Sequence, residues 1–252
     1  MVDVIPQRNP SLFQLPGKRK PLGVVGGMGS LATAKFLEVL AQESEVENDQ
    51  DHIPFITLSL PDISDRSRAI TIGSDAPLRQ ILERALWLEK AGCGAIAIPC
   101  NTAHFWASEI RYALSIELIN MIELIRTPLH VTSGKIRDIR TIVLGTSATM
   151  MQPLYPGTNK QCFGDEVWQS ISELRDSTAT VITDVKAGNI TRAKENLQQL
   201  VQDARSLNPD AIILGCSELS AISGGLAADG NIIDPITILA KECIKWWNGG
   251  QM

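Results

Sequence analysis

The sequence has 252 residues, of which 44% are hydrophobic and 20% are charged, a balance typical of a globular protein with a packed core. The net charge of −5 and the pI near 5.3 argue against a surface for nucleic acid or an anionic membrane, so neither is an expected partner. No uninterrupted apolar run approaches the ~20 residues of a membrane helix, and we expect a cytoplasmic protein.

The first 20 residues predict a loose N-terminal extension. They contain Pro6, Pro10 and Pro16, and a short basic stretch at residues 18–20 precedes the first apolar run. A signal peptide has its basic residues before an apolar stretch, and this segment lacks that order.

Beyond this extension, short apolar runs alternate with amphipathic stretches, which is typical of strand–helix–strand units around parallel sheets. Strands are predicted at residues 21–27, 53–60, 95–99, 140–145 and 211–215. Helices are predicted at residues 30–46, 74–92, 102–116, 187–207 and 234–248. Ser74 or Asp75 is the expected cap of the second helix, with Pro77 in its first turn and Gly92 at its end.

Two pairs of segments match between the halves of the chain. Residues 23–30 resemble residues 142–147, and residues 95–102 resemble residues 211–218. The paired segments are separated by nearly the same number of positions in each half, which indicates two similar α/β units in tandem.

The fold class predicted is therefore α/β, with two similar Rossmann-like parallel-sheet domains in a pseudo-twofold arrangement and the active site between them. Residues 1–20 form the extension. The first domain is expected to span residues 21–121 and to be completed by residues 233–252, with residues 122–232 as the second domain.

A cysteine follows the corresponding strand in both halves, Cys100 in the first and Cys216 in the second. The carboxyl ends of parallel strands form the ligand crevice of such sheets, so both thiols are expected to face it. A following helix N-terminus stabilises negative charge and can lower a thiol pKa below its free value of ~8.5. The other cysteines, Cys93, Cys162 and Cys243, lack this placement and are expected to be packing or surface residues, and no cysteine has zinc-site spacing.

Two thiols on opposite sides of a small ligand suit one reaction class. Inverting a stereocentre requires removal of a proton from one face of a carbon and delivery of a proton to the other face. One thiolate and one thiol perform both steps without a cofactor and exchange roles in the reverse direction. No cofactor is expected, and no lysine stands in a recognisable pyridoxal phosphate setting.

Four motifs carry a resemblance to a known family: Gly-Gly-Met-Gly-Ser at residues 26–30, Pro-Cys-Asn-Thr-Ala-His at 99–104, Leu-Gly-Thr at 144–146 and Gly-Cys-Ser-Glu-Leu at 215–219. With these motifs the sequence resembles the aspartate/glutamate racemase superfamily, and within it the aspartate racemase branch. The resemblance implies that Cys100 and Cys216 are the two catalytic acid/bases, with Cys216 serving the L-enantiomer and Cys100 the D-enantiomer.

The same resemblance implies the residues that bind the substrate. Residues 61–67 resemble the family's loop with a carboxylate-binding arginine, here Arg66, and residues 184–188 resemble its segment with a substrate-binding lysine, here Lys186. The remaining predicted lining residues come from the four motifs: Met28, Asn101, Thr102, Thr146, Ser217 and Glu218. An arginine and a lysine suit a dicarboxylic amino acid. The predicted activity is interconversion of L- and D-aspartate by a homodimer.

Several alternatives stay open at this point. The first alternative is another member of the same superfamily, such as a glutamate racemase, a hydantoin racemase or a maleate isomerase. A nucleotide-binding protein is suggested by the loose GxGxxA pattern at residues 27–32, although Leu60 ends the second strand where an acidic residue is expected. A catalytically silent amino-acid sensor is a third reading. His104 lies one helical turn beyond Cys100 and is expected to shape the helix start rather than to transfer protons.

Overall fold

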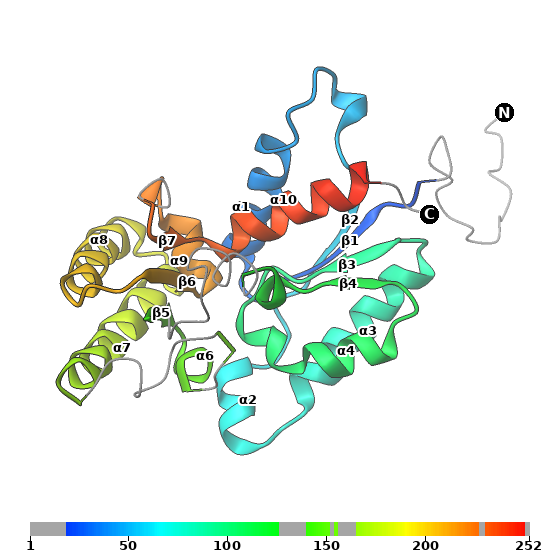
Figure 1. Ribbon diagram of the computed structural model, residues 1–252. Helices are drawn as coiled ribbons and strands as arrows, with labels where there is room; N and C mark the ends of the chain where they lie inside the picture. Colours follow the sequence, from blue (N-terminus) through cyan, green and yellow to red (C-terminus); the bar gives the residue numbers. More distant parts are fainter. Residues whose placement is uncertain (1–18, 126–139, 152–153, 156–164, 227–229, 250–252) are drawn as a thin grey trace, which may run out of the picture.

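A computed structural model describes residues 19–125, 140–151, 154–155, 165–226 and 230–249 (Figure 1). Most of the predicted N-terminal extension, together with Cys162, lies outside the described residues. The predicted α/β class is confirmed, since parallel strands alternate with helices. Whether the domains divide at the predicted boundaries stays a prediction.

The described strands form two parallel sheets. The larger has the order β2-β1-β3-β4 and the smaller has the order β5-β6-β7. The strands are β1 (Leu22–Gly26), β2 (Phe55–Ser59), β3 (Ala95–Ala97), β4 (Glu117–Ile119), β5 (Thr141–Gly145), β6 (Ala211–Gly215) and β7 (Ile232–Ile233). The helices are α1 (Ser30–Gln42), η1 (Asp49–Asp51), α2 (Arg66–Ile72), α3 (Ala76–Lys90), η2 (Thr102–Trp106), α4 (Ala107–Ala113), α6 (Ser147–Met151), α7 (Asp165–Lys186), α8 (Ile190–Ser206), α9 (Ser217–Ile222) and α10 (Pro235–Asn248).

Alternate residues of the larger sheet enter two different cores. Leu22 and Val24 of β1 pack with α1 and α10 on one face, whereas Val25 packs with α3 and α4 on the other. A strand that is buried on both faces has no polar side, which explains the unbroken apolar run that marked β1 in the sequence. The last helix, α10, thus returns to cover the sheet on which the chain begins (Figure 1).

The repeated segments pair in the same way in both sheets. In the larger sheet Gly23 of β1 lies opposite Ile96 of β3, and in the smaller sheet Ile142 of β5 lies opposite Ile212 of β6. These are equivalent positions of the two matched segment pairs. The repeat in the sequence therefore corresponds to a repeated strand pairing with the same register.

Several predicted elements differ from the structure. The helix predicted at residues 102–116 is a 3₁₀ turn, η2, followed by the short α4, and strand β4 begins at Glu117. The helix predicted from residue 187 begins at Ile190, because Gly188 with φ of +80° separates α7 from α8. Helices α2 and α7 and the short strand β7 were not predicted. Strands β4 and β7 are only three and two residues long, which is too short for a recognisable alternation.

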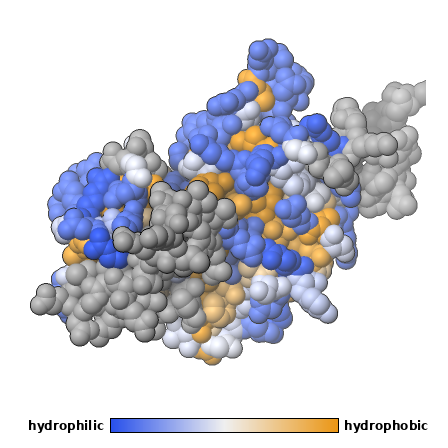
Figure 2. All heavy atoms as spheres, in the orientation of Figure 1, coloured by the Kyte–Doolittle hydropathy of each residue, from blue (hydrophilic) through white to orange (hydrophobic). Residues whose placement is uncertain are grey.

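The face drawn in Figure 2 is mostly hydrophilic over the helices, with hydrophobic atoms gathered over the part built around the larger sheet. Among the described residues, none of the helices combines the length and the apolar character that crossing a membrane requires. The cytoplasmic location stays a prediction.

The turn after β1 depends on a glycine. Gly27 has φ of +86°, and a Cβ atom there would lie 2.4 Å from the carbonyl oxygen of Leu60. The Gly27 amide donates to Thr33 Oγ1 at 3.0 Å, and the same hydroxyl donates to the Gly29 carbonyl at 2.9 Å. The glycine loop is thus held between the end of β2 and the first turns of α1.

This contact predicts that Gly27→Ala destabilises the fold by roughly 2–4 kcal/mol, because alanine meets both an unfavourable φ and the backbone of Leu60. Gly73→Ala is the matched control, since Gly73 has φ of +68° with nothing within 4 Å of the added Cβ. Gly73→Ala is expected to lower the free energy of unfolding by only roughly 1–2 kcal/mol, the cost of a positive φ for an alanine. Urea unfolding measures both, and equal losses would contradict the clash.

Candidate active site

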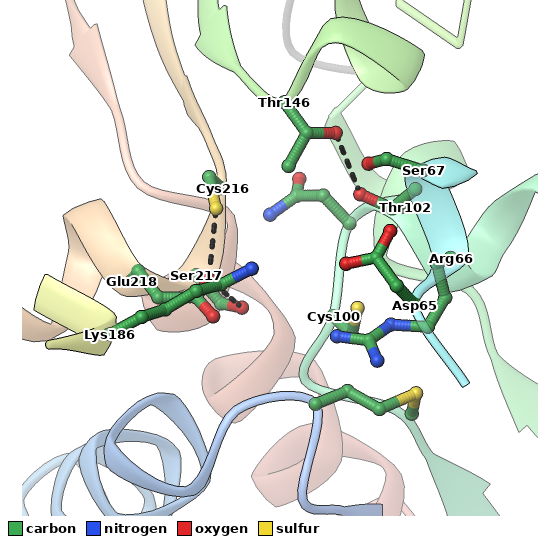
Figure 3. A pocket seen from close by; sticks show the side chains of 12 residues that line it. Asp65, Arg66, Ser67, Cys100, Thr102, Thr146, Lys186, Cys216, Ser217 and Glu218 are labelled. Atoms are coloured by element: carbon green, nitrogen blue, oxygen red, sulfur yellow. Dashed lines mark hydrogen bonds between the residues drawn. The ribbon is translucent and has the colours of Figure 1, made fainter. Parts of the chain in front are cut away.

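The carboxyl ends of strands from both sheets meet at one pocket (Figures 1 and 3). The loop after β1 supplies Met28, the segment after β3 supplies Cys100, and the residue after β6 is Cys216. The pocket is lined by Met28, Asp65, Arg66, Ser67, Cys100, Asn101, Thr102, Thr146, Lys186, Cys216, Ser217 and Glu218. All ten residues singled out in the sequence thus line the same pocket, although their roles stay a proposal.

The two cysteines enter this pocket from opposite sides, Cys100 from the larger sheet and Cys216 from the smaller one (Figure 3). Their side chains are nearly buried, with 5% and 4% exposure. Cys93 and Cys243, the other described cysteines, are buried in the cores of the larger sheet and do not line the pocket. This agrees with the packing role predicted for them.

Burial raises both thiol pKa values more than the helix starts lower them, although backbone hydrogen bonds with Ala103 and Glu218 act in the expected direction. Burial raises the pKa of the Cys100 thiol and raises that of Cys216 well above its usual value. The helical segments that follow the two cysteines, η2 and α9, have only five and six residues. Desolvation of a thiolate therefore outweighs any dipole that these segments provide.

The neighbouring charges make the two cysteines different from each other. The Arg66 guanidinium lies beside Cys100 and partly offsets the effect of burial on its pKa (Figure 3). Cys216 instead donates a hydrogen bond at 2.9 Å to Oε2 of Glu218, and the negative charge of that carboxylate raises the pKa of Cys216 further. Arg66 thus favours the thiolate of Cys100, whereas Glu218 disfavours that of Cys216.

Three threonine hydroxyls connect the two sheets at the edge of the pocket. Thr102 Oγ1 lies 3.1 Å from Thr146 Oγ1 and 3.0 Å from Thr149 Oγ1, and the last two hydroxyls are 3.0 Å apart. Thr102 follows β3, whereas Thr146 and Thr149 lie at the end of β5 and in α6. Thr149 was not predicted, although it lies one helical turn beyond Thr146.

Asn101 presents an unpaired donor at the same place. The hydroxyl of Tyr155 donates to Oδ1 of Asn101, which leaves Nδ2 buried without a hydrogen-bond partner among the described residues. An unpaired buried donor is costly, and a ligand that accepts from it recovers that cost. Tyr155 itself is 2% exposed. Nothing in the local sequence marked Tyr155, because it lies 54 positions from its partner.

Two positive charges come from different elements. Arg66 is the first residue of α2, whose N-cap Asp65 accepts a hydrogen bond from the Arg68 amide at 2.8 Å. Lys186 is the last residue of α7 and reaches the pocket from the smaller sheet's side (Figure 3). No ion pair engages Lys186 within the described part of the chain, so its ammonium is available to a ligand anion. Asp65 and Ser67 line the pocket without having been predicted, and their position next to Arg66 was the available signal.

A metal centre finds no support in the described residues, where no group of three or more histidine, cysteine, aspartate or glutamate side chains is placed to hold an ion. The arrangement instead offers two thiols, a carboxylate hydrogen-bonded to one of them, two cations and several neutral donors. Such a set suits proton transfer on a small anionic molecule.

Comparison with known proteins agrees with this chemistry. Residues 25–243 match the Asp/Glu/hydantoin racemase family. The chain belongs to this family. It is therefore an isomerase of the amino-acid racemase class.

Three relatives show how close the similarity is. The broad specificity amino-acid racemase RacX of Bacillus subtilis (strain 168) is 27% identical over 239 residues, covering 89% of this chain and 96% of the relative. The aspartate racemase of Picrophilus torridus has a TM-score of 0.74 at 29% identity, covering 91% of this chain and 94% of that one. A structure described as a putative Asp/Glu racemase from Yersinia pestis has a TM-score of 0.65 at 21% identity, covering 91% and 99%, and supports the fold alone.

His104 is locked by the backbone rather than free to act on a substrate. Met121 N donates to its Nε2 at 3.3 Å, so Nδ1 carries the proton and donates to the Cys100 carbonyl at 2.8 Å. Burial lowers the pKa of His104 from 6.5 to about 4, which keeps the ring neutral. The histidine thus holds the backbone of Cys100 in place, in agreement with the structural role predicted for it.

This lowered pKa predicts a pH dependence of stability. Below pH 6.5 the unfolded chain binds a proton at His104 that the folded chain excludes until about pH 4. The contribution of His104 to the free energy of unfolding should therefore be constant above this window and fall within it by roughly 3 kcal/mol as the pH decreases. Urea unfolding of His104→Asn is expected to show a shallower fall across the window. His52→Asn is the control. If its free energy of unfolding falls across the window as little as that of His104→Asn, the pH dependence does not come from His104.

Proposed function

We propose that this racemase interconverts L- and D-aspartate without a cofactor by moving the Cα proton between Cys100 and Cys216. The observation that carries the proposal is the entry of two nearly buried thiols into one pocket from opposite sides (Figure 3). One thiolate removes the Cα proton from one face of the carbon. The other thiol then delivers its own proton to the opposite face, and the two sulfurs have exchanged protonation states.

The unequal surroundings of the thiols support a division of roles. Arg66 favours the thiolate of Cys100, which is then the base for the D-enantiomer. Glu218 accepts the Cys216 proton at 2.9 Å, so transfer along this hydrogen bond produces a Cys216 thiolate and a neutral Glu218. Cys216 in that form is the base for the L-enantiomer, with the protonated Cys100 as the acid.

The two cations support an acidic substrate. Arg66 and Lys186 line the pocket from opposite sides and together bind one carboxylate of aspartate (Figure 3). Asn101 Nδ2, which has no partner among the described residues, donates a hydrogen bond to the other carboxylate. The aspartate racemase of Picrophilus torridus is the structural neighbour that favours this substrate. A wider substrate range is the second candidate, because the Bacillus subtilis relative is a broad specificity racemase. A homodimer also stays a prediction.

The two-thiol scheme predicts that Cys100→Ala and Cys216→Ala each reduce racemisation of L-aspartate by at least about 100-fold, because either loss removes one of the two proton transfers. The measurement is conversion of L-aspartate under reducing conditions, with deuterium incorporation at Cα in D₂O. Cys93→Ala, a buried cysteine outside the pocket, is the control and should keep the wild-type rate. Near-normal activity in either pocket variant would contradict a two-base reaction.

The cation pair predicts the substrate preference. Arg66→Gln and Lys186→Gln should each lower kcat/KM for L-aspartate by roughly 10- to 100-fold, since a hydrogen bond to a charged group contributes about 1.5–3 kcal/mol. Lys194→Gln, an exposed lysine on α8, is the control and should be without effect. Assays on L-aspartate, L-glutamate and L-alanine rank the substrates. Equal rates on all three would instead favour a broad specificity racemase.

A further inference from the structure

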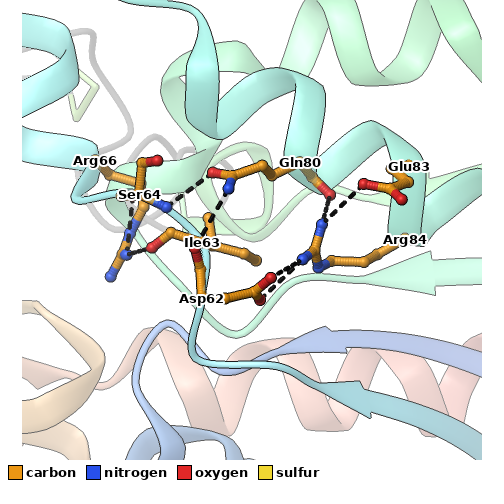
Figure 4. A network of polar contacts seen from close by, with 7 residues as sticks. All are labelled: Asp62, Ile63, Ser64, Arg66, Gln80, Glu83 and Arg84. Atoms are coloured by element: carbon orange, nitrogen blue, oxygen red, sulfur yellow. Dashed lines mark hydrogen bonds and ion pairs between the residues drawn. The ribbon is translucent and has the colours of Figure 1, made fainter.

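The guanidinium of Arg66 is anchored to the backbone of the loop that precedes it. Its Nη1 donates to the carbonyl of Ile63 at 3.1 Å and to that of Ser64 at 3.2 Å (Figure 4). Its Nε is buried without a partner among the described residues, and the group lies beside Cys100 in the pocket. The position of Arg66 therefore depends on where this loop's backbone lies.

Gln80 of α3 holds that backbone from the side away from the pocket. The Ser64 amide donates to Gln80 Oε1 at 2.8 Å, and Gln80 Nε2 donates to the Asp62 carbonyl at 3.3 Å (Figure 4). Both ends of one side-chain amide thus bind the loop, 16 and 18 positions away in the chain.

Arg84, one turn further along α3, holds the same loop by its acidic residue. Its Nη2 lies 2.8 and 2.7 Å from the two carboxylate oxygens of Asp62, and its Nη1 donates to the Gln80 carbonyl at 2.7 Å (Figure 4). Residues four positions apart lie on the same face of a helix, so Gln80 and Arg84 act on the loop together. The two terminal nitrogens of the planar guanidinium thus bind two different groups, Nη2 the Asp62 carboxylate and Nη1 the Gln80 carbonyl, which restricts its orientation more than a lysine ammonium would.

The Arg84–Asp62 ion pair contributes more to the position of the loop than to the stability of the fold. The Arg84 side chain is 8% exposed, but that of Asp62 is 65% exposed, and an ion pair with such access to water contributes little to the free energy of folding. What the contacts do provide is a fixed backbone between Asp62 and Ser64, the segment whose carbonyls receive Arg66.

We propose that Gln80 and Arg84 are positioning residues, which fix the backbone of residues 62–64 so that the guanidinium of Arg66 stays in the pocket beside Cys100. As a statement about racemisation this rests on the proposed function. The positioning of Arg66 can be tested without the proposed function, because the reactivity of the Cys100 thiol depends directly on the nearby guanidinium.

The first test measures alkylation of Cys100 by iodoacetamide at one alkaline pH, followed by peptide mass spectrometry, with Cys216 as the reference in each sample. Arg66→Gln is expected to slow Cys100 alkylation, because the cation that favours the thiolate is lost. Gln80→Met and Arg84→Met are expected to slow it by roughly two- to tenfold, the range for losing hydrogen bonds that hold a group in place. Arg79→Met is the matched control on α3, since Arg79 pairs with Asp75 on the exposed side.

The second test is a double-mutant cycle with L-aspartate as substrate. Gln80→Met should lower kcat/KM in the wild-type background and have no further effect in the Arg66→Gln background, because the arginine through which it acts is already absent. Among the conservative variants, Gln80→Glu should keep a higher kcat/KM than Arg84→Lys, because a glutamate keeps the oxygen that accepts from the Ser64 amide. Asp62→Ala removes the exposed partner of Arg84 with little effect on folding. It should likewise lower kcat/KM in the wild-type background and have no further effect in the Arg66→Gln background.

The outcomes separate this proposal from the proposed function. If Arg66→Gln slows Cys100 alkylation but the α3 variants match Arg79→Met, the positioning role is wrong. If Arg66→Gln itself leaves the alkylation unchanged, Arg66 does not act on Cys100 and the proposal fails as well. If alkylation follows the expected order but no acidic amino acid is racemised, the positioning role stands and the proposed function is wrong.

Discussion

Burial of ionisable groups is the constraint on which the site depends. A thiolate loses most of its hydration in this pocket, so the charges in contact with each sulfur decide whether it ionises. Arg66 provides a cation next to Cys100, and Glu218 provides a proton acceptor next to Cys216. The same burial strengthens each of these interactions, because little water competes for the groups involved. Two residues of one type thereby acquire different acid–base properties from their neighbours alone.

The pocket also requires that two separate sheets hold their positions relative to each other. The hydrogen bonds of Thr102 with Thr146 and Thr149 cross between the strand ends of the two sheets, as does the contact between Tyr155 and Asn101. These groups are almost all buried, so leaving any of them unpaired would be costly. The contacts that orient the site are therefore also contacts that join the two halves of the protein.

Positioning in this site extends beyond the residues that line it. Arg66 is held by loop carbonyls, the loop is held by Gln80 and Arg84, and these two side chains belong to a helix packed on the larger sheet. His104 does the same for Cys100 by bonding its carbonyl. Arg66 and Cys100 are thus each connected to the rigid core by a short chain of hydrogen bonds, which suits a reaction that needs two sulfurs aligned with one carbon.

The sequence by itself determined the main strands, the internal repeat and the two pocket cysteines, because apolar runs, glycine turns and a cysteine after each equivalent strand are local signals. The other predicted residues around the pocket came from the resemblance of their motifs to the racemase family. It did not determine the state of those residues. The helix start after each thiol was visible in the sequence, whereas the burial that raises both thiol pKa values was not. Only the tertiary structure decided that Glu218 bonds Cys216, that Tyr155 orients Asn101 and that Arg84 holds Asp62. The last two contacts join residues 54 and 22 positions apart, and no local pattern specifies which distant side chains packing brings together.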